Sequence, residues 1–236
     1  MTKLSVNINK IATIRNARGG SIPSIVNAAI KCQNFGADGI TIHPRPDERH
    51  ITRKDVYDLK NVITKEYNIE GYPSPDFINM VLEIKPDQVT LVPDGPDVLT
   101  SCAGWDTVKF KSYLREVVQE FKSCGIRTSI FIDPNLSMIE AAKDCETDRV
   151  ELYTESYAKN YNTNKKEAIA PYLEAAKRAR DIGLGINAGH DLNLENLAYF
   201  AENIPNLLEV SIGHALISDS IYLGLENTIQ MYKRLL

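Results

Sequence analysis

The sequence predicts an α/β protein of the (β/α)8, or TIM, barrel class with extra short helices. Short apolar segments rich in β-branched residues alternate with helical patterns along the whole chain, which is typical of a parallel sheet. Eight such repeats occur, and the length of 236 residues is close to the roughly 250 residues of an eight-fold barrel. We therefore expect residues 1–236 to form one barrel domain.

The strands follow from hydrophobicity alone, and a helical pattern comes after each of them. Glycine-containing helix ends, such as FGADG before the second strand and DIGLG before the seventh, supply the left-handed cap that returns the chain to the sheet. A doubly wound open sheet is the alternative, but no GxGxxG follows the first strand and eight repeats favour closure. The predicted strands are 4–8, 39–43, 67–71, 88–92, 127–132, 148–153, 183–187 and 208–212.

Two connections are longer than the barrel pattern requires. Residues 93–107 follow the fourth strand and are rich in Pro, Gly, Ser and Thr, so they form either a lid over the substrate or an ordered surface loop. Residues 154–168 follow the sixth strand, are rich in tyrosine, and are expected to hold an extra turn or short helix.

Composition excludes several classes of protein. The net charge of −4 argues against a nucleic-acid-binding protein, which needs a basic face. The N-terminus lacks the apolar core of a signal peptide, and no apolar run approaches the roughly 18 residues of a membrane span, so we expect a cytoplasmic protein without membrane contact. The cysteines show no CxxC spacing and are expected to be reduced rather than paired or metal-bound: Cys32, Cys102, Cys124 and Cys145.

The four histidines all fall near the carboxyl ends of predicted strands. His43 closes the second strand, and His50 lies in the loop after it. His190 follows the seventh strand by three residues, and His214 follows the eighth by two. Because barrel enzymes place catalytic residues at these strand ends, we expect all four on one catalytic face. A single histidine is more often structural, but four on one face weaken that interpretation.

Two strands carry a glutamate among apolar residues. Glu70 lies in the third strand and Glu151 in the sixth. An unpaired buried carboxylate is costly, so each either pairs with a cation or serves as an acid or base with a shifted pKa. A purely structural role is the alternative for both.

Two segments have the composition of anion sites. The loop HPRPDERH (43–50) combines arginines, which match phosphate oxygens, with histidines. NAGHD (187–191) and SIGHA (211–215) follow the last two strands, where barrels bind phosphate on helix N-termini, and Gly189 and Gly213 allow close backbone approach. The sequence therefore predicts two phosphorylated ligands or one bisphosphate.

The sequence lacks the residues that several other kinds of catalysis require. Lys10 is the one lysine near a predicted strand end, which argues against a Schiff-base aldolase, and no compact cluster calls for a metal. GxSxG and P-loop motifs are also missing from the sequence. Acid–base chemistry on small phosphorylated substrates is the function that these residues predict.

Five motifs resemble, in order and spacing, the pyridoxine 5′-phosphate synthase family: VNINKIATIRNARGG, GADGITIHPRPDERHI, NIEGYPSP, NAGHDL and IGHALI. The resemblance runs from about residue 4 to about residue 235. It implies a (β/α)8 barrel with added helices and a homo-oligomer, an octameric assembly of dimers. It also implies a transferase that condenses 3-amino-2-oxopropyl phosphate with 1-deoxy-D-xylulose 5-phosphate, using neither cofactor nor metal.

The resemblance also implies residue roles. His43 and Glu70 match general bases, His190 matches a proton donor, and Glu151 matches a glutamate that stabilises a charged intermediate. The positions that match contacts to the aminoketone phosphate are Asn7, Arg18, Gly213 and His214. The positions that match contacts to the sugar phosphate are Arg45, His50 and Ser101.

Three departures from the family pattern affect substrate contacts. Asn9 and Lys10 stand where many members have Asp-His, a pair that contacts the sugar phosphate. Ser101 replaces a loop threonine, with Thr100 beside it, so the register of that hydroxyl stays open. Asp191 stands where glycine is common, and its contact with substrate must come from its backbone N–H.

Two other functions are alternatives. Another phosphosugar barrel, an isomerase or epimerase, needs one acid–base pair and one phosphate site, so the basic segment 43–50 would be surplus. A barrel that binds without catalysis would not need the polar groups at the strand ends.

Overall fold

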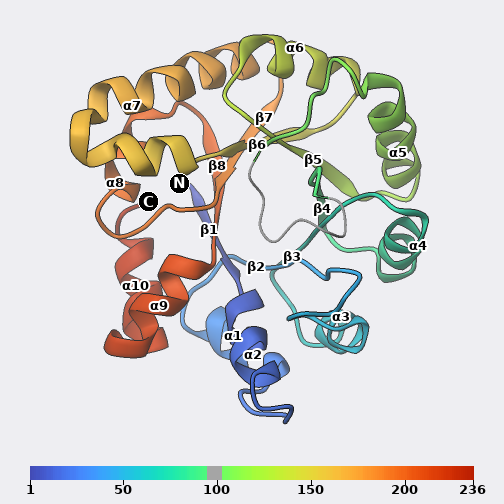
Figure 1. Cartoon of the computed structure of the whole chain (residues 1–236), viewed down its shortest axis with the longest axis vertical. Coiled ribbons are helices and arrows are strands. Elements are labelled where there is room, and N and C mark those ends of the chain that lie inside the picture. Colours follow the sequence, from blue (N-terminus) through green and yellow to red (C-terminus); the bar gives the residue numbers. More distant parts are fainter. Residues whose placement is uncertain (95–102) are drawn as a thin grey trace.

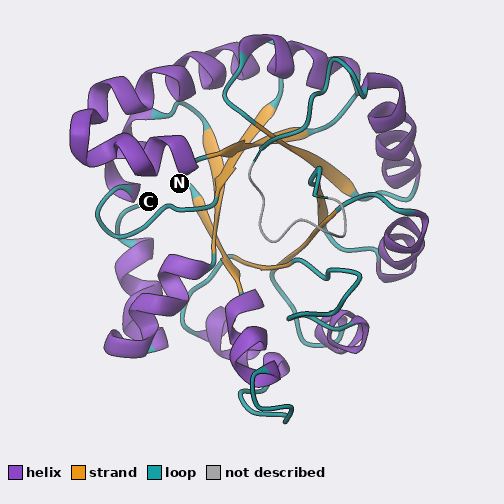
Figure 2. Ribbon diagram, viewed as in Figure 1, coloured by secondary structure: helices purple, strands orange, loops and turns teal. Residues whose placement is uncertain are grey.

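Eight parallel strands close into a barrel in sequential order, with β8 pairing with β1, and helices surround it (Figures 1 and 2). The computed structural model describes residues 1–94 and 103–236. The predicted fold class is confirmed. The strands are β1 (Lys3–Asn7), β2 (Gly39–Ile42), β3 (Glu66–Gly71), β4 (Gln88–Leu91), β5 (Arg127–Ile132), β6 (Arg149–Tyr153), β7 (Gly185–Gly189) and β8 (Leu207–Ile212).

At least one helix follows every strand and covers the outside of the barrel (Figure 2). Two helices follow β1 and two follow β8. The helices are α1 (Asn9–Asn16), α2 (Ile25–Asn34), α3 (Arg53–Lys60), α4 (Pro75–Ile84), α5 (Lys111–Ser123), α6 (Leu136–Asp144), α7 (Glu155–Asp181), α8 (Leu197–Asn203), α9 (His214–Leu223) and α10 (Leu225–Lys233).

Each predicted strand overlaps an observed one. The bounds of β7 differ most from the predicted bounds, 183–187. β7 begins at Gly185 rather than at residue 183, because Gly183 adopts φ 74° and belongs to the turn that ends α7. The strand consequently extends to Gly189, and His190 follows it directly instead of three residues later.

The tyrosine-rich segment after β6 is helical, as expected. It forms the first part of α7, which is interrupted at Asn164, where φ is −156° and the backbone leaves the helical region. The long helix therefore consists of an extra helix and the helix that returns the chain to β7.

The barrel interior is unusually polar. Ile40 and Ile42 of β2 lie in the apolar core shared with the helices, whereas the alternate residues face the interior. There, Asn68 donates to Oγ1 of Thr41 (3.4 Å) and accepts from Oγ1 of Thr90 (3.1 Å), and all three are fully buried. Carboxylates at the same alternating positions of β3 and β6 therefore enter a polar environment.

A capping box orders the loop that leads from β2 to α3. The Thr52 hydroxyl accepts from the N–H of Asp55 (3.2 Å), and the Asp55 carboxylate accepts from the N–H of Thr52 (2.8 Å). Asp55 also pairs with Arg15 of α1 (2.6 Å), and Arg15 donates to the carbonyl of His50 (3.0 Å). These contacts fix the backbone at His50 relative to the first helix.

Within the described residues, no helix combines the length and the apolar character needed to cross a membrane.

Candidate active site

The four predicted catalytic side chains come from strands or loops at the carboxyl end of the barrel. His43 directly follows β2, Glu70 is the penultimate residue of β3, Glu151 lies in β6, and His190 directly follows β7. Parallel strands in a closed barrel bring these ends together, and electrostatic coupling links Glu70 to His190 and to Glu151.

Glu70 is held by two neighbours that are distant in sequence. Ser211 Oγ of β8 donates to Oε1 (3.3 Å), and Asn7 Nδ2 of β1 donates to Oε2 (3.4 Å). Burial raises the pKa of Glu70 to about 7, with Asp94 adding to the rise, while the Ser211 hydrogen bond and the charge of His190 oppose it. A carboxyl group with this pKa exchanges a proton near neutral pH.

Glu151 is more deeply enclosed, with 3% of its surface exposed. Burial raises its pKa well above the ordinary value, and the charges of Glu70 and Glu209 raise it further, against a hydrogen bond from Thr90. Because two adjacent carboxylates cannot both ionise cheaply, the pair formed by Glu70 and Glu151 keeps a proton to higher pH than an isolated glutamate.

His190 lies in a tight turn at the end of β7 with φ 75°. Its Nδ1 is 2.5 Å from Oδ2 of Asp191, and its ring meets Tyr153 edge-to-face at 5.1 Å between centroids. Burial alone lowers the pKa of His190, but the hydrogen bond and charge of Asp191 and the charge of Glu70 outweigh it, so the pKa is raised. His190 is therefore suited to carry a proton at neutral pH.

His43 has the opposite environment. It is 8% exposed, and burial followed by the charges of Arg45, His50 and Arg49 lowers its pKa well below the ordinary value. The imidazole is therefore neutral at pH 7 and able to accept a proton.

His50 is also neutral. Burial lowers its pKa to about 4, with Arg45 and Lys10 contributing. Its Nδ1 accepts from the N–H of Ile51 (2.9 Å), which assigns the proton of the neutral ring to Nε2. The ring lies 6.4 Å from that of His43, between centroids, so one hydrogen-bond donor and one base lie close together.

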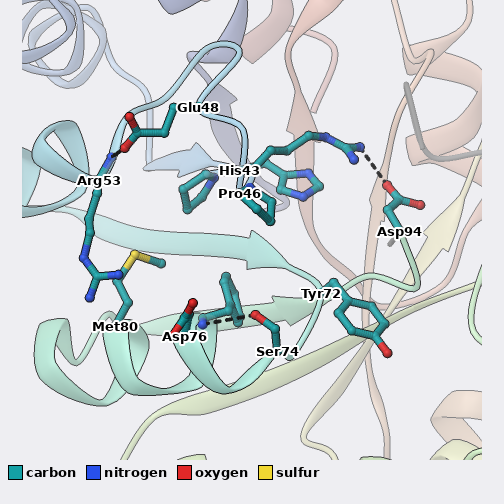
Figure 3. A pocket seen from close by; sticks show the side chains of 12 residues that line it. His43, Pro46, Glu48, Arg53, Tyr72, Ser74, Asp76, Met80 and Asp94 are labelled. Atoms are coloured by element: carbon teal, nitrogen blue, oxygen red, sulfur yellow. Dashed lines mark hydrogen bonds and ion pairs between the residues drawn. The ribbon is translucent and has the colours of Figure 1, made fainter. Parts of the chain in front are cut away.

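A cleft of about 420 Å³ opens between the loop after β2 and the start of α4 (Figure 3). Nη2 of Arg45 lies 2.9 Å from Oδ2 of Asp94, and both side chains are buried in its wall (Figure 3). This ion pair joins the loop after β2 to the segment that follows β4. The lining residues are His43, Pro44, Arg45, Pro46, Glu48, Arg53, Tyr72, Ser74, Asp76, Phe77, Met80 and Asp94.

The residues after β1 order the site. The Oδ1 of Asn7 accepts from the N–H of Asn9 (3.1 Å), and the Oδ1 of Asn9 accepts from the N–H of His43 (3.0 Å). A β-carbon at Gly213 would lie 3.1 Å from the β-carbon of Asn7, so glycine allows the backbone after β8 to approach β1 closely. The side-chain oxygen of Asn9 thus supports His43.

Four other predicted residues are exposed. Lys10 acts on His50 through space, His214 begins α9, and the side chain of Asp191 is partly exposed beside His190. Arg18 lies in the turn after α1, and the connection from α1 to α2 is at the outer edge of the molecule, away from the barrel axis (Figure 1). In the single chain, the structure does not bring Arg18 to Glu70.

Two predictions fall outside the described residues. Thr100 and Ser101 lie within 95–102, as does most of the loop 93–107 that was expected to form a lid. After this segment, the N–H of Gly104 donates to Asp133 (3.0 Å), which anchors the chain at the end of β5.

Sequence reasoning missed three contacts of the site. Asp94 faces Arg45, Ser211 donates to Glu70, and Thr90 bonds Glu151. Ser211 is the penultimate residue of β8 and Asp94 lies three residues beyond the end of β4, so both are near strand ends, the signal that identified the histidines. Thr90 sits in an apolar strand and has no such signal.

The N-terminus of α9 is a candidate backbone partner for an anion. No described side chain caps the N-terminus of α9 at Gly213, so the first N–H groups of that helix are available to phosphate.

Among the described residues, no group of three or more His, Cys, Asp or Glu could hold a metal ion. Cys32, Cys124 and Cys145 are free thiols, and the first and last of these are buried.

Comparison with known proteins finds similar sequences along the whole chain. The family model described as "Pyridoxal phosphate biosynthesis protein PdxJ" matches residues 4–236. A pyridoxine 5′-phosphate synthase of Flavobacterium johnsoniae is 63% identical over 232 residues, which cover 98% of each chain. One from Bacteroides fragilis is 63% identical over 236 residues, which cover 100% of each chain.

Solved structures show similarity in fold alone. The tryptophan synthase α-subunit of Pyrococcus furiosus matches with a TM-score of 0.64 at 16% identity, over 99% of this chain and 95% of that one. A phosphoribosylanthranilate isomerase from Thermotoga maritima matches with a TM-score of 0.61 at 14% identity, over 100% and 98%. The full-length family match and the 63% identity confirm the resemblance seen in the motifs, and the chain belongs to the pyridoxine 5′-phosphate synthase family of biosynthetic enzymes.

Proposed function

We propose that the chain condenses 3-amino-2-oxopropyl phosphate with 1-deoxy-D-xylulose 5-phosphate to give pyridoxine 5′-phosphate, phosphate and water. One observation carries the proposal: the site holds titratable groups whose pKa values are moved in different directions. The pKa of Glu70 is raised to about 7, that of His190 is raised, and that of His43 is lowered. When the pKa values of neighbouring groups are moved apart in this way, some of the groups can act as acids and others as bases within one site.

The chemistry consists of proton transfers. The amine adds to the ketone of the sugar phosphate, and loss of water gives an imine. Proton removal and phosphate expulsion follow, then carbon–carbon ring closure, and a last dehydration makes the ring aromatic. Each step is redox-neutral, so acid–base side chains suffice and we propose that no cofactor takes part.

The bases are His43 and Glu70, and the proton donor is His190. His43 is neutral and Glu70 is partly ionised at pH 7, so both can accept a proton. His190 keeps its proton because Asp191 and Glu70 stabilise the imidazolium. Glu151, which stays protonated, donates a hydrogen bond to negative charge that develops on an intermediate.

The two phosphates bind on different sides of the mouth. Arg45 and Nε2 of His50 hold the sugar phosphate, with Lys10 at the rim. Thr100 and Ser101 are proposed to add hydroxyl contacts. The aminoketone phosphate binds the N-terminus of α9 at Gly213 and His214, with Asn7 near the reacting atoms. Arg18 contacts this phosphate, and the N–H of Asp191 also faces a substrate.

The remaining expectations are part of the same proposal. The chain acts as one domain, in the cytoplasm, within an octameric assembly of dimers. Arg18 is exposed in the connection from α1 to α2, which lies at the outer edge of the molecule (Figure 1), so its contact with the aminoketone phosphate is proposed to form within such an assembly.

The test is product formation by purified protein from both substrates without added cofactor, monitored by phosphate release and by pyridoxine absorbance. Both signals should require both substrates together. Turnover of either substrate alone would instead indicate an isomerase or epimerase, and phosphate release without the chromophore would exclude ring closure.

A further inference from the structure

The turn after β7 contains two consecutive residues with positive φ that are not glycine. His190 has φ 75° and Asp191 has φ 33°. Residues with a β-carbon adopt this region at a cost, and they persist there when their surroundings hold them. The turn is consequently not the cheapest conformation for these side chains, and specific contacts must maintain it.

Those contacts come from two neighbouring elements. The Thr154 hydroxyl lies 2.7 Å from the carbonyl oxygens of both Gly189 and His190, and it donates to them. The amide of Asn196 donates to the carbonyl of Asp191 (3.2 Å). With both sides of the turn anchored, the two side chains point so that Nδ1 of His190 meets Oδ2 of Asp191 at 2.5 Å.

The charged groups around the pair favour a charged imidazole. The carboxylates of Asp191, Glu70 and Glu155 act on His190, and Tyr153 packs its ring edge-to-face against the imidazole. Asp191 in turn is influenced by His214 of α9 and Lys159 of α7, besides His190 itself. Its hydrogen bond to His190 is the main reason that the pKa of Asp191 is lowered, so the carboxylate is ionised where it meets the ring.

We infer that Asp191 is a positioning residue that binds Nδ1–H of His190, fixes the orientation of the ring, and presents a protonated Nε2 to the substrate. This inference rests on the proposed function, because it assumes that His190 is the proton donor. A bond at one ring nitrogen determines the tautomer and the direction of the other. It gives the Asp191 side chain a task that glycine at this position does not perform.

A turn-forming role alone would need no carboxylate. Asn and Gly both tolerate positive φ, so Asp191→Asn and Asp191→Gly preserve the turn. The Asn variant retains an oxygen that accepts from Nδ1–H but loses the charge, whereas the Gly variant loses both. Glu155→Gln is the matched control, because Glu155 acts on His190 through space, while its own hydrogen bonds come from Tyr153 (3.0 Å) and Lys159 (3.5 Å).

The first measurement is an NMR titration of His190 in the substrate-free variants. Its pKa should fall in both Asp191 variants and fall less in Glu155→Gln. Because no substrate is present, this result does not depend on the proposed reaction. An unchanged titration of His190 in both Asp191 variants would overturn the inference.

The second measurement is the pH dependence of kcat. We expect kcat to fall about 10-fold in the Asn variant and about 100-fold in the Gly variant, within the range that a positioned general acid contributes, with both KM values nearly unchanged. The basic limb of the profile should move to lower pH. A shifted titration with wild-type kcat and pH profile would show that His190 is not the proton donor, and the inferred role in catalysis would fail with it. No turnover in the wild type, by contrast, would contradict the proposed function while the titration still tested the pair.

Discussion

The carboxylate of Glu151 occupies the space that a β-carbon at residue 189 would fill. The two residues belong to adjacent strands, and the register pairs Glu151 with Asn187 and Tyr153 with Gly189. Glycine at the end of β7 is therefore required by the neighbouring Glu151 side chain rather than by its own φ angle. Gly189 of the NAGHD segment contributes to the site by leaving space for the Glu151 carboxylate.

Gly189→Ala should displace Glu151 and reduce kcat by about 100-fold or more, because Glu151 would lose its position near Glu70. The matched control is Gly20→Ala, since a β-carbon at Gly20 meets nothing within 4 Å. Steady-state kinetics and circular dichroism on both variants make the comparison. Wild-type kcat in a folded Gly189→Ala protein would show that the position of Glu151 is unimportant.

Glu70→Gln should lower kcat by about 10²- to 10⁴-fold, the contribution of a positioned acid–base group, while phosphate-ligand affinity changes little. Glutamine keeps the size and shape of the side chain that faces Ser211 and Asn7, but its amide has one accepting oxygen instead of two and cannot take up the proton. Stopped-flow turnover and calorimetric binding of the sugar phosphate separate the two effects. A variant with the wild-type rate would remove Glu70 from the mechanism.

The pH profile of kcat/KM should have an acid limb near pH 7. Glu70 must be ionised to act as a base, and its pKa is raised to about 7, so activity falls as the pH drops through that value. His190 must be protonated, so its raised pKa sets the basic limb. Because Glu70 and Glu151 interact, the acid limb reports the pair. An acid limb near pH 4.5, the ordinary value for glutamate, would contradict this.

The raised pKa of Glu70 should also lower the free energy of unfolding as the pH rises. Its pKa is higher in the folded protein, about 7, than the ordinary 4.5, so the folded state binds more protons and loses stability as the pH rises between these values. Relative to the wild type, Glu70→Gln should gain about 1–3 kcal/mol between pH 4.5 and pH 8. Urea unfolding of both proteins at the two pH values measures this difference, and a pH-independent difference would contradict it.

Arg45→Ala should raise KM for the sugar phosphate by about 10- to 100-fold, the loss of one charge-assisted contact, and affect the aminoketone phosphate less. It should also destabilise the fold by about 3 kcal/mol, because the buried carboxylate of Asp94 loses the guanidinium that faces it. Adding Asp94→Asn should restore much of the stability without restoring KM. A change confined to the aminoketone phosphate would show that the two sites are assigned backwards.

Much of the candidate site was predictable because strand ends are local features. The hydrophobicity of the sequence places a strand to within two residues. A polar residue near the end of that strand can then be recognised from the local sequence, without knowing which other strands lie beside it. His43, at the end of its predicted strand, and His190, three residues after its own, were found from strand ends, whereas Glu70 was found as a carboxylate inside an apolar strand. The error at β7 arose because GLGIN reads as an apolar strand from its first glycine, although the left-handed turn at Gly183 delays the strand by two residues.

The sequence by itself determined the strand–helix order, the barrel class and the edge on which the polar residues gather, since these depend on periodicity and on neighbours within a few positions. Only the tertiary structure decided which groups meet. Ser211 reaches Glu70 across 141 positions of sequence, and Arg45 reaches Asp94 across 49. Barrel closure and strand register create such contacts, and the same contacts and the burial that comes with them set each protonation state, because a pKa depends on the charges and the solvent around the folded group.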